Sequence, residues 1–171
     1  MGRLLALAAL GASAWAQTGF ELYGHAGAGA SYAGGWNFGD GRAAGAGAGV
    51  RLGRRWAIEG EYSRWSHNWI AGLGGFRLRG HADAVAGSAV LHLLPGRRAE
   101  PFFLAGAGTV HSAGRGYDPL LNFGAGVKVR LVRGFFLRPE VRLQAGLGEG
   151  RPGRFGAPSQ ARLQLGAGYR W

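Results

Sequence analysis

Residues 121–131 read Leu-Asn-Phe-Gly-Ala-Gly-Val-Lys-Val-Arg-Leu, and every second residue of this stretch is apolar. The positions between the apolar residues hold Asn122, two glycines, Lys128 and Arg130. A period of two is typical of a β-strand, because successive side chains of a strand point to opposite faces. Residues 121–131 are therefore predicted to form a strand with one apolar face and one polar face.

The same alternation recurs from residue 20 to the end of the chain, and it predicts eight strands. Short connections follow the second, fourth and sixth strands, whereas longer connections follow the first, third, fifth and seventh. The connection after the third strand is expected over residues 64–80. This asymmetry is typical of transmembrane barrels. The predicted fold is therefore all-β, an eight-stranded antiparallel up-and-down transmembrane β-barrel. Its strands are expected at residues 20–32, 44–52, 56–63, 81–93, 101–111, 121–131, 135–143 and 161–171.

Composition excludes several other classes of protein. The 171 residues include 35 glycines, and glycine recurs here at every second position, whereas collagen requires it at every third. The absence of cysteine excludes disulfides and thiolate zinc sites. The net charge of +11 would suit an acidic partner, but only 17% of the residues are charged and 47% are hydrophobic, which does not fit a disordered basic tail. We expect no cofactor, no metal and no nucleic-acid partner.

The first residues have the pattern of a secretory signal peptide. Arg3 supplies a positive charge, residues 4–10 form a short apolar run, and Ala14-Trp15-Ala16 is a small-x-small cleavage site. The apolar run is too short to span a membrane, which takes about 20 residues in a helix. We therefore expect a signal peptide at residues 1–16, cleavage near Ala16 and Gln17, and a barrel domain at residues 17–171.

Charged side chains fall on the polar face of every strand whose two faces can be assigned. An Arg or Lys facing lipid would cost about 2–4 kcal/mol at the bilayer midplane, so these side chains are expected inside the barrel. An eight-stranded barrel is just wide enough for side chains to fill its interior. We therefore predict a closed, salt-bridged lumen that also holds much of the glycine. Its charge network comprises Glu21, Arg51, Glu59, Glu61, Lys128, Arg130, Arg138, Glu140, Arg142, Arg162 and Arg170.

Three local features of the sequence concern the detailed geometry of the strands. In the expected hairpin registers, Gly47 and Gly49 lie opposite Glu61 and Glu59, and the turn at residues 132–134 places its glycine in the left-handed region. Pro139 cannot donate a ladder hydrogen bond, so a local irregularity is expected there. The facing of residues 81–93 and 101–111 stays open, since Asp83 and His92 fall on opposite faces of the first of these strands.

Aromatic and basic residues near the strand ends suggest contacts with the membrane. Six aromatics suit the two membrane interfaces: Phe20, Tyr32, Trp56, Tyr62, Tyr169 and Trp171. Five arginines in the long connections are candidates for pairing with lipopolysaccharide phosphates, the alternative being a solvated basic surface: Arg77, Arg79, Arg115, Arg151 and Arg154.

The stretch from Asn122 to Leu131, followed by Leu137-Arg-Pro-Glu-Val-Arg142, resembles consecutive strands of the small bacterial outer membrane protein beta-barrel domain family, which is an OmpA-like transmembrane barrel. Pro101-Phe102 before Ala105-Gly-Ala-Gly108 is similar to its fifth strand, and the final strand ending in Trp171 is similar to the signal read by the barrel assembly machinery. The resemblance implies a monomer in the bacterial outer membrane, in contact with lipid and lipopolysaccharide. The chain ends at the eighth strand, so a tethering role is not expected.

The expected function is structural or surface-related and not enzymatic, through envelope integrity or contacts made by the long loops. A lipid A deacylase or acyltransferase is a competing hypothesis. Its catalytic His and Ser would have to meet on one surface, yet His111-Ser112 and Ser66-His67 are sequence neighbours that point to opposite faces. No catalytic residue is therefore predicted. Two more hypotheses stay open at this point: a narrow gated pore, and a soluble lipocalin-like carrier with the apolar face turned inward.

Overall fold

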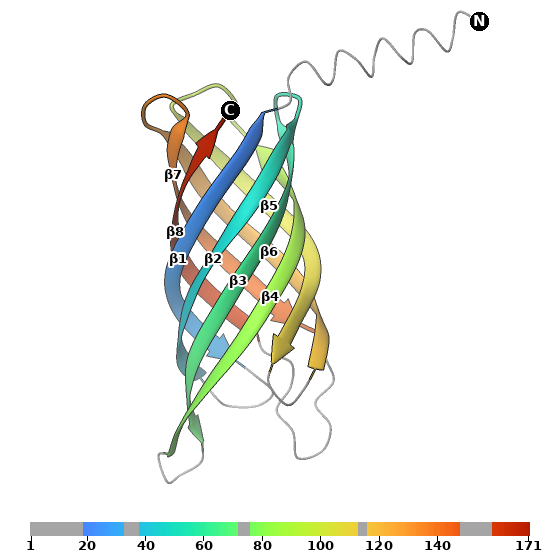
Figure 1. Ribbon diagram of the computed structural model, residues 1–171, viewed down its shortest axis with the longest axis vertical. Coiled ribbons are helices and arrows are strands. Elements are labelled where there is room, and N and C mark those ends of the chain that lie inside the picture. The colour runs from blue at the N-terminus through green and yellow to red at the C-terminus, as the bar shows by residue number, and fades with distance from the viewer. Residues whose placement is uncertain (1–18, 33–37, 72–75, 113–115, 148–158) are drawn as a thin grey trace, which may run out of the picture.

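The computed structural model describes residues 19–32, 38–71, 76–112, 116–147 and 159–171. The predicted signal peptide, residues 1–16, lies outside these ranges. The described residues form a closed antiparallel barrel in which each strand pairs with its neighbours in sequence and β1 pairs with β8 (Figure 1). The predicted fold is confirmed. The strands are β1 (Phe20–Tyr32), β2 (Phe38–Leu52), β3 (Trp56–Ala71), β4 (Phe76–His92), β5 (Ala99–Ser112), β6 (Gly116–Arg130), β7 (Phe135–Gly146) and β8 (Ser159–Arg170).

Several strands extend further toward the long-connection end than the alternation predicts. The hairpin of β3 and β4 continues to the pair Ala71 and Phe76, so the expected connection at residues 64–80 is mostly strand. Arg77 and Arg79 therefore lie in β4, and their prediction as loop residues was wrong. Sequence alternation fails here because outward residues such as Arg64 are polar beyond the apolar belt. The side chains of Arg77 and Arg79, and the whole of Arg115, Arg151 and Arg154, lie outside what the structure describes.

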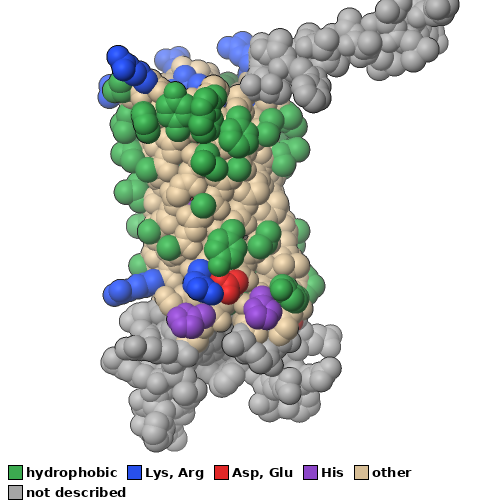
Figure 2. Space-filling model, in the orientation of Figure 1, with side chains coloured by type: hydrophobic (Ala, Val, Ile, Leu, Met, Phe, Trp, Pro, Cys, Tyr) green, Lys and Arg blue, Asp and Glu red, His purple; other side chains and the backbone are tan. Residues whose placement is uncertain are grey.

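The barrel wall carries its apolar side chains outward. Leu22, Ile58 and Leu163 are about half exposed or more, whereas Glu59 and Arg138 point inward and are buried. Figure 2 shows hydrophobic side chains gathered across the visible face of the barrel, just below the short-turn end. This polarity suits a lipid environment outside and a polar lumen inside. The lipocalin-like hypothesis, which needs an apolar lumen and a charged outer wall, was wrong. Among the residues described, there is no helix with the length and apolarity needed to cross a membrane.

The structure also assigns the facing of β4 and β5. His92 and Val90 point inward and are fully buried, and Asp83 lies on the outward face. On β5, Phe102 and Leu104 are buried inside the barrel. The inward positions of these two strands are thus largely apolar, which explains why a contrast between polar and apolar faces could not orient them.

Inward glycines accommodate neighbouring side chains and backbone. Gly47 pairs with Glu61 and Gly49 with Glu59, as predicted. A Cβ on Gly49 would lie 2.9 Å from Cγ of Glu59, and one on Gly47 would overlap the ring of Tyr23. On β5, a Cβ on Gly108 would meet backbone, with Cα of Ala86 at 2.6 Å. The glycine face is therefore required by close packing inside the barrel.

The β6–β7 hairpin contains both predicted irregular features. Gly134 has a φ of 88°, as predicted for the turn, and Arg133 before it also has a positive φ, of 50°. The Phe135 N–H donates to the Val132 carbonyl at 3.0 Å, closing the turn. Further along the hairpin, the residue pairing is interrupted between the pairs Gly126–Glu140 and Val129–Leu137, next to Pro139.

Gly108→Ala is expected to destabilise the barrel by about 1–3 kcal/mol, because the new methyl group must displace the backbone of β4. Gly87→Ala is the matched control, since a Cβ at Gly87 meets nothing within 4 Å. The measurement is the free energy of unfolding in urea for the protein in detergent micelles. Equal stability of the two variants would contradict the packing role of the inward glycines.

Candidate functional site: the charged lumen

Six of the eleven predicted lumen residues form a buried layer across the middle of the barrel. Each of these side chains belongs to a residue that is no more than 5% exposed. Strand β3 lies four strands from β7 in the closed order, so the layer joins opposite walls of the barrel. We call this set the central layer. Its members are Glu59 and Glu61 from β3, Arg138, Glu140 and Arg142 from β7, and Arg162 from β8.

Ion pairs connect the members of the central layer along and across the lumen. Glu140 accepts from Nε of Arg138 at 2.7 Å and from Nε of Arg142 at 2.8 Å. Across the lumen, Arg138 donates to Glu59 at 2.8 Å, and both Arg142 and Arg162 lie 2.8 Å from Glu61. With three arginines and three glutamates, the layer carries no net formal charge.

Aromatic rings and amides complete the surroundings of the central layer. The Arg138 guanidinium lies between two rings, 4.6 Å from the centroid of Tyr23 and 4.4 Å from that of Phe102. The Tyr23 hydroxyl donates to Glu59 at 3.2 Å. Arg162 donates to the side-chain oxygen of Gln144 at 2.7 Å and also to that of Gln164. These contacts hold the arginines in place and occupy donors that the glutamates do not reach.

The other five predicted lumen residues lie nearer the short-turn end, in a second cluster. Lys128 donates to Glu21, and Arg170 lies 4.0 Å from the same carboxylate. Arg51 donates at 2.6 Å to Glu100, which also accepts from Arg130 and from the backbone N–H of Gly96.

Sequence reasoning missed two members of this second cluster, Glu100 and His92. Both are completely buried, and Nδ1 of His92 lies 3.6 Å from the Glu100 carboxylate. Glu100 was expected in a turn, but it lies in β5 and pairs with Lys128 of β6. Extending the alternation of β5 back by two residues places Glu100 on the face of Phe102, but the sequence alone does not orient that face toward the lumen.

Toward the long-connection end, the part of the lumen lined by β2 to β6 is largely apolar. Trp65 of β3 is completely buried, and its indole N–H donates to Ser63 at 3.0 Å. It belongs to a cluster of buried side chains that come from β2 to β6. The alternation did not reveal this cluster, because alanines predominate on the strands concerned. The other members are Ala43, Ala82, Ala84, Ala86, Val110 and Leu120.

The predicted interface aromatics point outward where their side chains are described. Trp56, Tyr62 and Phe20 are about half exposed. Phe20 contacts Trp171 at 5.4 Å between ring centroids, and Trp171 contacts Tyr169 at 4.8 Å. The Tyr32 side chain lies outside the described part.

An ion pair on the outer wall was not predicted. Arg64 of β3 donates to Asp83 of β4 at 3.0 and 3.2 Å, and the Tyr62 hydroxyl donates to the same carboxylate at 2.6 Å.

The ring of His111 on β5 contacts the ring of Tyr117 on β6, with 4.8 Å between the ring centroids. Within the described ranges, three or more His, Cys, Asp and Glu side chains do not come together as a metal site.

Glu140→Gln is expected to lower the free energy of unfolding by about 3 kcal/mol, because it leaves Arg138 and Arg142 without a shared buried counter-charge. Asp83→Asn removes the carboxylate of a solvent-accessible ion pair and is expected to cost at most about 1 kcal/mol. Urea titration of both variants in the same micelles tests this. A loss for Glu140→Gln no larger than that for Asp83→Asn would contradict the role assigned to the central layer.

Comparison with known proteins agrees with this architecture. Three solved structures share the fold, each under 25% identical to this chain. Neisserial surface protein A has a TM-score of 0.68 and 14% identity, covering 89% of this chain and 97% of its own. The N-terminal barrel of Pseudomonas aeruginosa OprF has a TM-score of 0.57 and 17% sequence identity. The match covers 90% of this chain and 97% of the OprF barrel. Ail of Yersinia pestis, solved with the heparin analogue sucrose octasulfate, has a TM-score of 0.58 and 15% sequence identity. The match covers 90% of this chain and 98% of Ail.

No curated protein sequence is significantly similar to the chain. The model of the outer membrane protein beta-barrel domain family matches residues 3–170, which confirms the resemblance seen in the sequence. The chain therefore belongs to the outer membrane protein beta-barrel domain family.

Proposed function

We propose that this protein is a non-enzymatic, non-conducting barrel of the bacterial outer membrane that supports envelope integrity and presents its long connections at the cell surface. The short turns and the C-terminus face the periplasm in this arrangement. Family membership and the outward band of apolar side chains support the location. Short periplasmic turns and longer extracellular loops are the rule for barrels of this class.

The central layer is the observation that carries the non-conducting part of the proposal. Its side chains come from opposite walls and are bonded to one another, with Arg138 packed between two aromatic rings. An ion crossing the lumen at this height would have to separate buried ion pairs, which costs several kcal/mol for each charge left without a partner. The apolar cluster around Trp65 adds a second filled zone beyond it.

A narrow gated pore is the second candidate, and the same layer motivates it. Glu61 bridges Arg142 and Arg162, and Glu140 bridges Arg138 and Arg142, so each carboxylate has two competing partners. Exchange between such partners would open the layer without unfolding the wall. The two candidates differ in whether the wild-type protein ever conducts.

Planar-bilayer recording separates these two candidates. The wild-type protein, checked as folded by its faster migration on a gel before boiling, is expected to give no current steps. Arg142→Ala is expected to give cation-selective steps, because it removes a central cation and leaves Glu61 and Glu140 facing an opened space. Arg97→Ala, in the β4–β5 turn, is the control and should stay silent. Regular steps from the wild-type protein would overturn the non-conducting proposal and favour the gated pore.

The proposed partners follow from the ends of the barrel. We propose that outer-membrane lipid surrounds the wall, and that the final strand with its exposed Trp171 is read by the barrel assembly machinery. Contacts between lipopolysaccharide phosphates and the five arginines named from the sequence also belong to the proposal. Arg42, exposed on the outer wall toward the long-connection end, adds a positive charge there, which supports such contacts.

A further inference from the structure

Most of the excess positive charge of the described part lies at the short-turn end of the barrel. The central layer is electrically balanced, so it contributes nothing to the net charge. At the short-turn end, nine basic residues stand against two acidic ones, Glu21 and Glu100. Figure 2 shows Lys and Arg side chains beyond the apolar band at this end. The basic residues are Arg51, Arg54, Arg55, Arg97, Arg98, Lys128, Arg130, Arg133 and Arg170.

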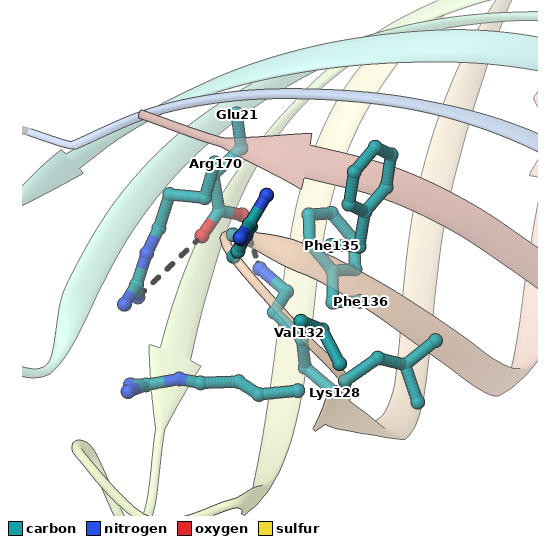
Figure 3. Close-up of a pocket in the computed structure, with 10 residues that line it drawn as sticks. Glu21, Lys128, Val132, Phe135, Phe136 and Arg170 are labelled. Carbon is teal, nitrogen blue, oxygen red and sulfur yellow. Dashed lines mark hydrogen bonds and ion pairs between the residues drawn. The ribbon is translucent and has the colours of Figure 1, made fainter.

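Part of this charge lines a pocket of about 250 Å³ at the β6–β7 turn (Figure 3). The pocket has a basic wall formed by Lys128, Arg130, Arg133 and Arg170, with Glu21 as its acidic member. Glu21 is engaged by Lys128 and Arg170, and Arg130 also donates to Glu100 outside the pocket, so four cations face two carboxylates and the wall keeps a positive excess. A volume below the range of about 300–1,000 Å³ typical of whole-ligand sites suits a single charged group.

Two of the arginines that line the pocket have unused donors. Arg133 forms no ion pair with any residue that the structure describes, and the buried Nε–H of Arg130 has no acceptor there. Arg133 has a positive φ of 50°, which the tight turn requires at both of its central residues, Arg133 and Gly134. The turn is anchored to β8 because the Arg170 N–H donates to the Gly134 carbonyl at 3.0 Å.

The opposite side of the pocket is apolar and continues onto the outer wall. Leu131, Val132 and Phe135 line it and are each about half exposed or more. Phe135 contacts Tyr169 edge-on at 5.0 Å, which extends the outward aromatic row of Tyr169, Trp171 and Phe20. The pocket thus combines a cationic inner wall with an apolar lip that meets the lipid-facing surface.

We propose that this pocket binds the phosphate headgroup of an anionic phospholipid from the inner leaflet of the outer membrane. The phosphodiester would pair with Arg130, Arg133 and Arg170, since guanidinium groups bind phosphate in a bidentate geometry. The acyl chains would lie along Val132 and Phe135 into the bilayer. A free phosphate ion would not use the apolar lip of the pocket. An acidic peptide would not need a pocket whose lip continues onto the lipid-facing wall.

Native mass spectrometry of the full barrel in maltoside micelles tests the proposal. The protein is titrated separately with phosphatidylglycerol, phosphatidylcholine and inorganic phosphate. We expect one phosphatidylglycerol to bind preferentially, because the choline ammonium is repelled by the arginines. Arg133→Asn should weaken this binding about fivefold, at about 1 kcal/mol for one basic residue near a lipid surface. Asparagine tolerates the left-handed conformation, so this substitution preserves the turn.

The double variant Arg133→Asn/Arg170→Gln should weaken binding by roughly 20-fold and leaves Glu21 paired with Lys128. Its matched control is Arg97→Gln/Arg98→Gln, which removes two charges from the same end outside the pocket and should change the affinity less than twofold. An equal loss for the two double variants would overturn the site in favour of diffuse charge attraction. Inorganic phosphate binding as tightly as phosphatidylglycerol would overturn the lipid assignment, and binding of no lipid would overturn both.

Discussion

Pairing of three buried arginines with three buried glutamates in a narrow lumen is the constraint on which the rest of this structure depends. A buried charge left without a partner costs several kcal/mol, so six such charges are compatible with folding only if almost all of them are matched. Glu59 and Glu61 reach Arg138, Arg142 and Arg162 only when β3 stands opposite β7 and β8. Barrel closure and neutralisation of the lumen therefore require each other.

The same constraint accounts for the distribution of small and large residues. Long charged side chains can meet near the axis because glycines, such as Gly49 beside Glu59, leave space at the wall. On the side of β4 and β5 the lumen contains no matching acids in its middle, and alanines with Phe102 and Leu104 fill it. Most of the unmatched cations lie at the short-turn end, beyond the apolar band. The distribution of charge and the packing of the lumen are thus parts of one arrangement.

Sequence alone predicted most of the wall and most of the charged side chains of the lumen, but not how these side chains pair across it, for identifiable reasons. The bounds of the first strand, Phe20–Tyr32, were correct because its outward face is apolar and its inward face is not. Beyond the apolar belt, at Arg64, the outward face is no longer apolar, so the sequence did not predict where β3 ends. On β4 both faces carry small residues, so the sequence did not predict which face points inward.

Contacts between distant strands were harder to predict than contacts within a strand. Glu140 was expected beside Arg138 and Arg142 because residues two apart share a face. The partnership of Arg138 with Glu59, 79 residues away in sequence, depends on which strands face each other across the lumen, and spacing along the chain carries no such information. Glu100 was missed because a strand end was read as a turn.

Hydrogen exchange at the arginine side chains tests the central layer most directly. The Nε–H groups of Arg138 and Arg142 donate to Glu140, and that of Arg162 donates to Gln164, so all three are buried and hydrogen-bonded. In ¹⁵N NMR spectra of the folded barrel in micelles, these three signals should exchange with solvent at least about tenfold more slowly than that of Arg97 in the exposed β4–β5 turn. Exchange of all three at the rate of Arg97 would show a hydrated, open lumen and would contradict the account.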